Sequence, residues 1–230
     1  MNSMNVSRVD TLDFMLVRQA IVARNHALWG SEVCVIGAQV ESAYNEALAH
    51  ISPRAKATRT ASPVACHKFL RVAQSTLMND DALKKVIQVS QALAKQQHTF
   101  TLSIDNPLDT LPGPVERRAM VRQLYTLKDL GCIKLAYNNY RLDTKPADLL
   151  IGLELYDFIK MPFPDSALRL SLNTRSGLFD RLYDRMLELI TATRVCFIAD
   201  NVEFSDSAML AKNLPFEYFQ GGYYSPADAL

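Results

Sequence analysis

Eight short β-rich runs alternate with amphipathic helical patterns along this 230-residue chain, and this alternation constrains the fold most strongly. It is typical of βα units, in which helices connect parallel strands. Eight strands are also the number that closes a (β/α)8 barrel. We therefore expect one α/β barrel domain over residues 14–230, preceded by an N-terminal extension of residues 1–13. The expected strands are 14–22, 32–36, 69–73, 100–104, 132–137, 156–160, 195–199 and 216–219.

The segments between these runs carry signals for the ends of helices. Asn79 is suited to cap a helix that continues to about residue 97, because its side chain can accept hydrogen bonds from the first turn. Pro114 and Gly131 are placed to open and close the next helix. Apolar residues at helical spacing predict two further helices, at 177–193 and 206–214. We expect these apolar stripes to pack into the core.

The composition narrows the classes of partner and cofactor. Lys and Arg number 25 against 24 Asp and Glu, so the net charge of +1 gives no general attraction to nucleic acid or anionic membranes. No apolar run reaches membrane-spanning length, and residues 1–10 lack the apolar core of a secretion signal. The four cysteines form no CxxC pair, and the four histidines are too few and too scattered to suggest a zinc site. We expect a cytoplasmic protein with reduced thiols and no direct contact with nucleic acid or membrane.

Three segments in the C-terminal half resemble one known family. IADNVE at residues 198–203 and FQGGYYSP at 219–226 resemble the last two strands of EAL domains, which read roughly IAEGVE and VQGYYFSKP. LKDLG at 127–131, followed by LAYNNY at 135–140, resembles LRxLG followed by IALDDFG. EAL domains are bacterial phosphodiesterases that open cyclic di-GMP. The resemblance implies an EAL-type TIM-like barrel, with an N-terminal third that is shortened between residues 36 and 69.

The resemblance also implies where a catalytic site would lie. EAL enzymes hold two divalent cations at the C-terminal ends of their strands, using Glu, Asn, Glu, two adjacent Asp and a further Glu. At the matching positions this chain keeps carboxylates only at Glu32 and Asp200. The other ligand positions carry neutral side chains, namely Ala73, Ser103, Asn138 and Asn139. A relict pocket of Gln19, Glu32, Lys160, Asp200 and Gln220 is expected to remain.

Too few carboxylates remain for a binuclear metal site. A close pair of unit charges contributes on the order of 4 kcal/mol at intermediate dielectric, so the loss of three carboxylates is expected to abolish the site. We therefore expect a degenerate phosphodiesterase with no metal, no cofactor and no enzymatic activity. Glu32 and Lys160 could form an ion pair in place of the metal, whereas Asn138 and Asn139 could equally serve as turn-forming residues.

Two functions of different classes fit a degenerate EAL barrel. The first is a regulatory protein-interaction module, similar to stand-alone degenerate family members that sequester a transcriptional activator. Its partner would be a transcriptional or signalling regulator of motility, adhesion or biofilm genes. The second is a non-hydrolysing receptor that binds cyclic di-GMP through Gln19, Glu32, Asp200 and Gln220. Ile36 stands where the family usually has a phosphate-gripping arginine, and this favours the interaction module over cyclic di-GMP binding.

An apolar segment after the sixth expected strand is the candidate surface for a protein partner. Residues 161–172 include Phe163, Leu168 and Leu170. We expect these side chains to form an exposed patch that a partner could cover.

Overall fold

A computed structural model describes residues 14–38, 41–52, 67–105, 113–141, 151–174 and 177–230. The N-terminal extension expected over residues 1–13 and the basic segment 53–66 lie outside the described residues. The expectation of a shortened N-terminal third therefore stays a prediction. No helix among the described residues is long and apolar enough to cross a membrane.

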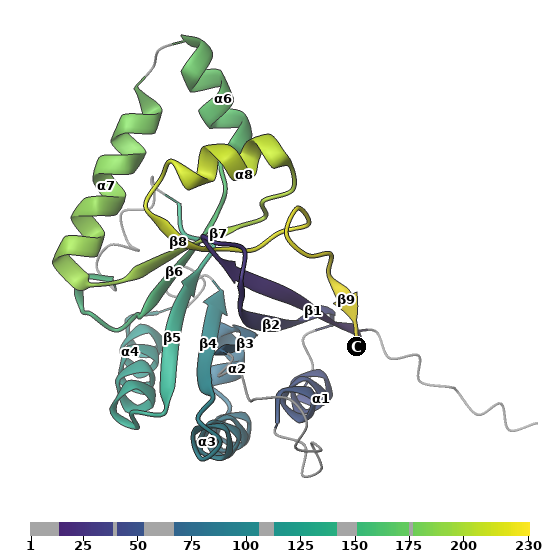
Figure 1. The fold of residues 1–230 in the computed structure, drawn as a ribbon. Coiled ribbons are helices and arrows are strands. Elements are labelled where there is room, and N and C mark those ends of the chain that lie inside the picture. The colour runs from purple at the N-terminus through teal and green to yellow at the C-terminus, as the bar shows by residue number, and fades with distance from the viewer. Residues whose placement is uncertain (1–13, 39–40, 53–66, 106–112, 142–150, 175–176) are drawn as a thin grey trace, which may run out of the picture.

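Eight strands form a closed barrel, because β1 pairs with both β2 and β8 (Figure 1). A short ninth strand, which the sequence did not predict, pairs with β1 beside β8. The strands are β1 (Phe14–Ala23), β2 (Leu28–Gly37), β3 (His67–Ala73), β4 (Thr99–Asp105), β5 (Ile133–Asn138), β6 (Phe158–Pro162), β7 (Cys196–Asp200), β8 (Phe216–Phe219) and β9 (Asp228–Ala229). All eight expected strands are confirmed, and their ends are within about four residues of the prediction.

One part of the expected topology is wrong, because β1 runs antiparallel to both of its barrel neighbours. The cause is the connection between β1 and β2, in which Ala23 and Ala27 are joined by a backbone hydrogen bond of 2.9 Å and His26 has a φ of 65°. A turn this short joins antiparallel strands, whereas parallel strands need a crossover of a dozen or more residues. The remaining barrel pairings, from β2–β3 to β7–β8, are parallel as expected.

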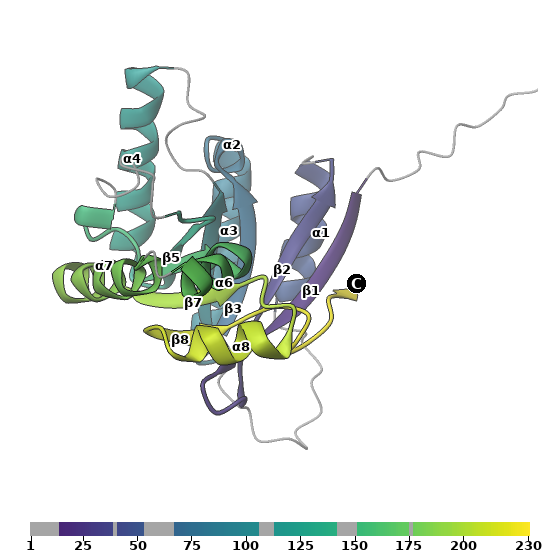
Figure 2. The same cartoon turned by 90° about the horizontal axis from the view of Figure 1, so that it is seen from above.

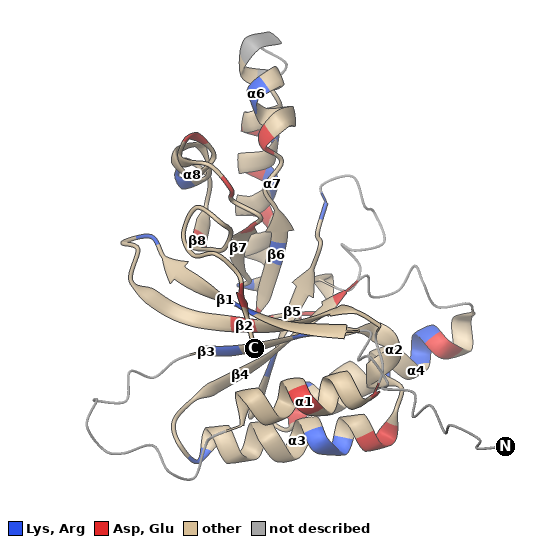
Figure 3. Cartoon of the chain, turned by 90° about the vertical axis from the view of Figure 1, so that its right-hand side faces the viewer, with Lys and Arg blue, Asp and Glu red and all other residues tan. Residues whose placement is uncertain are grey.

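Helices surround the barrel, and α6 and α7 extend away from the strands as a pair (Figures 1 and 2). Basic and acidic residues are interspersed on α3 and α4, in keeping with the small net charge (Figure 3). The described helices are α1 (Glu41–Ile51), α2 (Gln74–Leu77), α3 (Asp80–Ala94), α4 (Pro114–Asp129), α6 (Asp165–Thr174), α7 (Leu178–Thr193) and α8 (Ser205–Lys212). The four helices expected from the sequence correspond to α3, α4, α7 and α8.

The predicted cap of α3 is present. Oδ1 of Asn79 accepts hydrogen bonds from the backbone N–H groups of Asp81 at 2.9 Å and Ala82 at 3.1 Å. Replacing Asn79 with alanine is expected to lower the free energy of unfolding by about 1 kcal/mol, because two N–H groups lose their acceptor. Urea denaturation measures this change, and Asn79→Asp is the matched control because aspartate retains the acceptor. Equal losses in both variants would contradict the cap.

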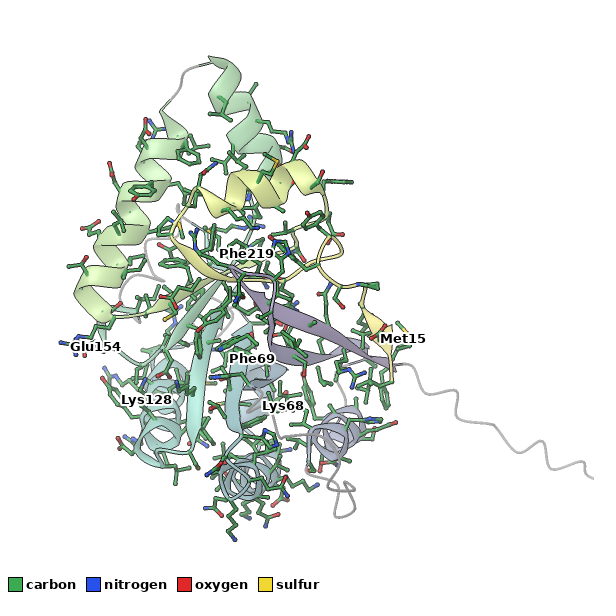
Figure 4. All side chains as sticks on the ribbon, in the orientation of Figure 1. Met15, Lys68, Phe69, Lys128, Glu154 and Phe219 are labelled. Carbon is green, nitrogen blue, oxygen red and sulfur yellow. The ribbon has the colours of Figure 1, made fainter. Side chains whose placement is uncertain are left out.

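Apolar side chains inside the barrel form a layer below its mouth. Alternate residues of a strand face opposite sides of a sheet, so the outward residues pack against the helices and the inward residues meet at the centre. The inner cluster contains Ile21, Phe69, Ala136, Phe158 and Ile198. Phe69 lies in the middle of the barrel in Figure 4. The ring of Trp29 closes this layer by stacking between His67 and Tyr218, with centroid distances of 4.0 and 3.6 Å.

Candidate functional site

A polar layer lies directly above the inner apolar layer, toward the C-terminal ends of the parallel strands. In four parallel strands, a polar residue occupies the next inward position, two residues beyond Phe69, Ala136, Phe158 and Ile198. The antiparallel β1 supplies a further polar residue, which lies two residues before Ile21. The barrel thereby directs polar side chains from many strands into one mouth. These residues are Gln19, Arg71, Asn138, Lys160 and Asp200.

Lys160 is at the centre of this layer and its side chain is completely buried. Its Nζ lies 2.5 Å from Oε2 of Glu32 and 3.6 Å from Oδ2 of Asp200. Burial alone would lower the pKa of Lys160, but the Asp200 and Glu32 carboxylates more than offset this and raise it. The raised pKa favours the charged ammonium, and the predicted Glu32–Lys160 ion pair is present.

Burial acts on Glu32 in the opposite sense. It tends to raise the pKa of the carboxyl, but the adjacent Lys160 ammonium outweighs it and holds the pKa below its usual value. The Glu32 carboxylate is thus charged and committed to an internal cation.

The two glutamines of the expected pocket bind each other and the ion pair. Nε2 of Gln220 donates to Oε2 of Glu32 at 3.1 Å and to Oε1 of Gln19 at 3.2 Å. Nε2 of Gln19 donates to the backbone carbonyl of Ser225 at 3.0 Å. The five residues of the expected relict pocket are therefore brought together, with much of their hydrogen-bonding capacity used internally.

The structure adds two charged residues that sequence reasoning missed. Asp105 ends β4, and its carboxylate accepts hydrogen bonds from Nε of Arg71, at 2.9 Å to Oδ2 and 3.2 Å to Oδ1. Nδ2 of Asn138 and Nδ2 of Asn139 also donate to Oδ1 of Asp105, at 2.5 and 3.0 Å. The alternation of residues along each strand could have revealed both. Asp105 is two residues after Ser103 and Arg71 is two residues before Ala73, so each faces the same side of its strand as an expected ligand position.

The expected lost-ligand positions have different roles in the structure. Asn138 is buried at the end of β5, whereas Asn139 adopts the left-handed conformation with a φ of 57°, so the turn-forming interpretation applies to Asn139. Ser103 is buried below Asp105, and Ala73 ends β3. Buried oxygens of four mouth residues have no partner among the described residues, namely Oε1 of Glu32, Oγ of Ser103, Oδ1 of Asn138 and Oε1 of Gln220.

The charges at the mouth are largely balanced internally. Three carboxylates, those of Glu32, Asp105 and Asp200, share the layer with the cations of Arg71 and Lys160. Within the described part of the chain, no group of three or more His, Cys, Asp or Glu side chains is arranged to hold a metal ion. Ile36 is about half exposed and pairs across the β1–β2 hairpin with Met15, at the outer end labelled in Figure 4.

The candidate partner surface requires a correction. Phe163 is 7% exposed and Leu168 is fully buried, so neither is part of an exposed patch. Phe163 follows β6 and packs its ring against Phe216 with centroids 6.3 Å apart, and Leu168 is on the core-facing side of α6. Leu170 alone of the three predicted residues is exposed, at 63%.

Comparisons with solved structures agree with the barrel assignment. The EAL enzyme Bd1971, with cAMP and cyclic di-GMP bound, aligns with a TM-score of 0.65 and 14% identity over 94% of this chain and 62% of that one. Bacillus subtilis YkuI, a protein with an EAL domain in complex with substrate cyclic di-GMP and calcium, gives 0.67 and 18% over 94% and 55%. The EAL domain of Mycobacterium smegmatis DcpA gives 0.65 and 15% over 93% and 92%.

These similarities confirm the predicted fold, an EAL-type (β/α)8 barrel. The chain spans less than two thirds of the length of the Bd1971 and YkuI chains. Neither a family model nor a curated protein matches the sequence.

Proposed function

We propose that this EAL-type barrel does not hydrolyse cyclic di-GMP and acts as a regulatory protein-interaction module. The observation that carries the proposal is the buried Lys160 ammonium, which contacts Glu32 at 2.5 Å and Asp200 at 3.6 Å. Both carboxylates that match metal ligands of the family are thus already in contact with one internal cation.

Electrostatics supports the absence of a binuclear centre. The three carboxylates and two cations of the mouth sum to a formal charge of −1, against the charge of two divalent cations. A divalent ion at Glu32 would face the Lys160 ammonium at close range, in a site too buried for water to screen the repulsion. The residues present therefore do not fit two divalent metals.

A protein partner remains the favoured ligand. Four of the six large apolar side chains that are more than half exposed in the described ranges lie on α6 or around the start and middle of α8, namely Leu170, Leu172, Phe204 and Met209. Exposed apolar groups of this kind mark contact surfaces in many proteins. We propose that the partner is a transcriptional or signalling regulator, in pathways such as motility, adhesion or biofilm formation.

A non-hydrolysing cyclic di-GMP receptor is the second candidate. Several structural relatives were solved with cyclic di-GMP bound, including the Pseudomonas aeruginosa FimX EAL domain. In this chain, Gln220 donates to both Gln19 and Glu32, and Gln19 donates to the backbone of Ser225, which leaves few free donors among the four residues first considered as ligands. Arg71 is the observation that favours the receptor, because it brings a cation to the mouth despite Ile36.

Isothermal titration with cyclic di-GMP, with and without magnesium, manganese or calcium, separates the two candidates. The interaction module predicts no metal-dependent heat and no change in melting temperature. Micromolar or tighter binding without turnover would instead support the receptor.

Affinity capture then tests the partner proposal. We expect the protein to retain a specific partner from cell extract, and we expect Leu170→Asp to release it while the melting temperature stays unchanged. Retention of the same partner by Leu170→Asp together with Met209→Asp would remove the α6–α8 region from consideration.

A further inference from the structure

We propose that Arg71 forms an oxyanion-binding site at the mouth of the barrel, suited to a carboxylate or a phosphodiester. The inference goes beyond the proposed function, which requires no small ligand at the mouth. It rests on the geometry and hydrogen bonding of a residue that does not belong to the expected relict pocket.

The guanidinium of Arg71 is anchored on one side only. Its Nε donates to both carboxylate oxygens of Asp105, at 2.9 and 3.2 Å. The two terminal nitrogens have no hydrogen-bond partner among the described residues, and neither is a buried unpaired atom. Since the Arg71 side chain is 34% exposed, these terminal N–H groups are accessible from the mouth.

The anchor of Arg71 is itself held in place. Asp105 accepts hydrogen bonds from the amides of Asn138 and Asn139, which come from the end of β5 and the turn after it. The ends of β4 and β5 therefore fix the plane of the guanidinium. A planar guanidinium presents a pair of parallel N–H groups that matches two oxygens of a carboxylate or phosphate. Fixing it beforehand reduces the entropy lost when the ligand binds.

The charge of Arg71 is secure. Burial opposes the charged form, but the hydrogen bond that Arg71 donates to Asp105 and the nearby Glu32 and Asp200 carboxylates raise the pKa of Arg71 above its usual value. The same carboxylates repel an approaching anion. We therefore expect the site to favour singly charged oxyanions that bind through two direct hydrogen bonds, with weak affinity for small probes.

If Arg71 only balanced the charge of Asp105, its two terminal guanidinium nitrogens would not need to be left without a partner. One hydrogen-bonded cation neutralises Asp105, and a lysine could supply it. The distinguishing property is bidentate recognition, which lysine cannot reproduce because its ammonium is a compact point charge. The exchange of arginine for lysine therefore separates the two roles.

The test is nuclear magnetic resonance of the arginine Nε–H groups during titration with dimethyl phosphate, acetate or cyclic di-GMP. We expect a saturable shift of the Arg71 signal with the first two probes. Arg71→Lys should weaken binding at least about tenfold, as measured on neighbouring backbone amides, because the bidentate contact is lost. Asp105→Asn should also weaken it by loosening the anchor. Arg18→Gln is the matched control, because Arg18 is an exposed arginine of β1 outside the polar layer.

The outcomes are distinct. A saturable response to dimethyl phosphate and acetate supports the Arg71 site, and an additional response to cyclic di-GMP would identify a phosphodiester source of the oxyanion. Absence of any saturable shift, or equal affinity in the wild type and Arg71→Lys, would overturn it. Because Arg71→Lys retains a cation beside Asp105, we expect this variant to fold, which keeps the comparison of affinities valid. Measured turnover of cyclic di-GMP would contradict the proposed function while leaving this result unaffected.

Discussion

Replacement of Lys160 with methionine is expected to lower the free energy of unfolding by about 3–5 kcal/mol at pH 7. Methionine fills a similar volume but removes the cation that contacts Glu32 and Asp200, which are both almost completely buried. Two carboxylates would then remain in the barrel without a cation in contact, and their desolvation would be uncompensated. Urea denaturation measures the loss.

The dependence of this loss on pH gives a second signature. In the wild type the pKa of Glu32 is held low, so its contribution is present above its unfolded pKa and is lost as the pH falls through the folded value. In Lys160→Met, only Arg71 and the hydrogen bond from Gln220 still oppose burial, so we expect the folded pKa of Glu32 to rise and stability to be lost as the pH rises through that value. The difference between the two proteins should therefore shrink as the pH falls from 7 toward 4.

Two controls isolate the buried pair. Lys128→Met removes a half-exposed partner of Asp157 at 3.0 Å and should cost no more than about 1 kcal/mol. The double variant Lys160→Met with Glu32→Gln removes one of the two buried carboxylates that lack a cation and should recover part of the loss. A Lys160→Met protein with wild-type stability, and an unchanged Glu32 titration, would contradict the account of this pair.

Leu168→Asp is expected to lower the free energy of unfolding by at least about 4 kcal/mol, because it combines the loss of a buried leucine with the burial of a carboxylate. The Leu168 side chain is fully buried in the main core. Leu170→Asp, two residues along the same helix, should change stability by no more than about 0.5 kcal/mol because that side chain is exposed. Thermal and urea unfolding of the pair measure the difference.

Only exposed residues of α6 are suitable for substitutions that test partner binding. A loss of partner binding in Leu168→Asp or Phe163→Asp would report unfolding, whereas Leu170→Asp reports the surface itself. Equal stabilities in Leu168→Asp and Leu170→Asp would mean that α6 does not pack on the barrel as described.

The fold was accessible from sequence because its strands and helices have distinct apolar periods and clear boundaries. Asn79, Pro114 and Gly131 mark helix ends by local chemistry, and each is found where it was expected. The direction of β1 was not predicted, because β-rich runs look the same in either orientation. The length of the connection after Ala23 was the available clue.

The site was only partly accessible because its residues meet through the closed sheet. Resemblance to the family placed Glu32, Lys160 and Asp200, and the barrel brings them into contact. Arg71 and Asp105 are 34 positions apart and were missed, because the expected pocket was taken from family positions and neither residue belongs to them. Exposure on α6 was misjudged for a related reason: an apolar helix shows its spacing in the sequence, but only the neighbouring core decides which face is covered.

The most direct test of the central claim is an assay of cyclic di-GMP hydrolysis by the purified protein with magnesium or manganese. An EAL phosphodiesterase serves as the positive control and buffer as the baseline. We predict no product above the buffer baseline with either metal. Metal-dependent turnover above that baseline would contradict the claim that the carboxylates at the mouth of this barrel are too few to hold a binuclear metal centre.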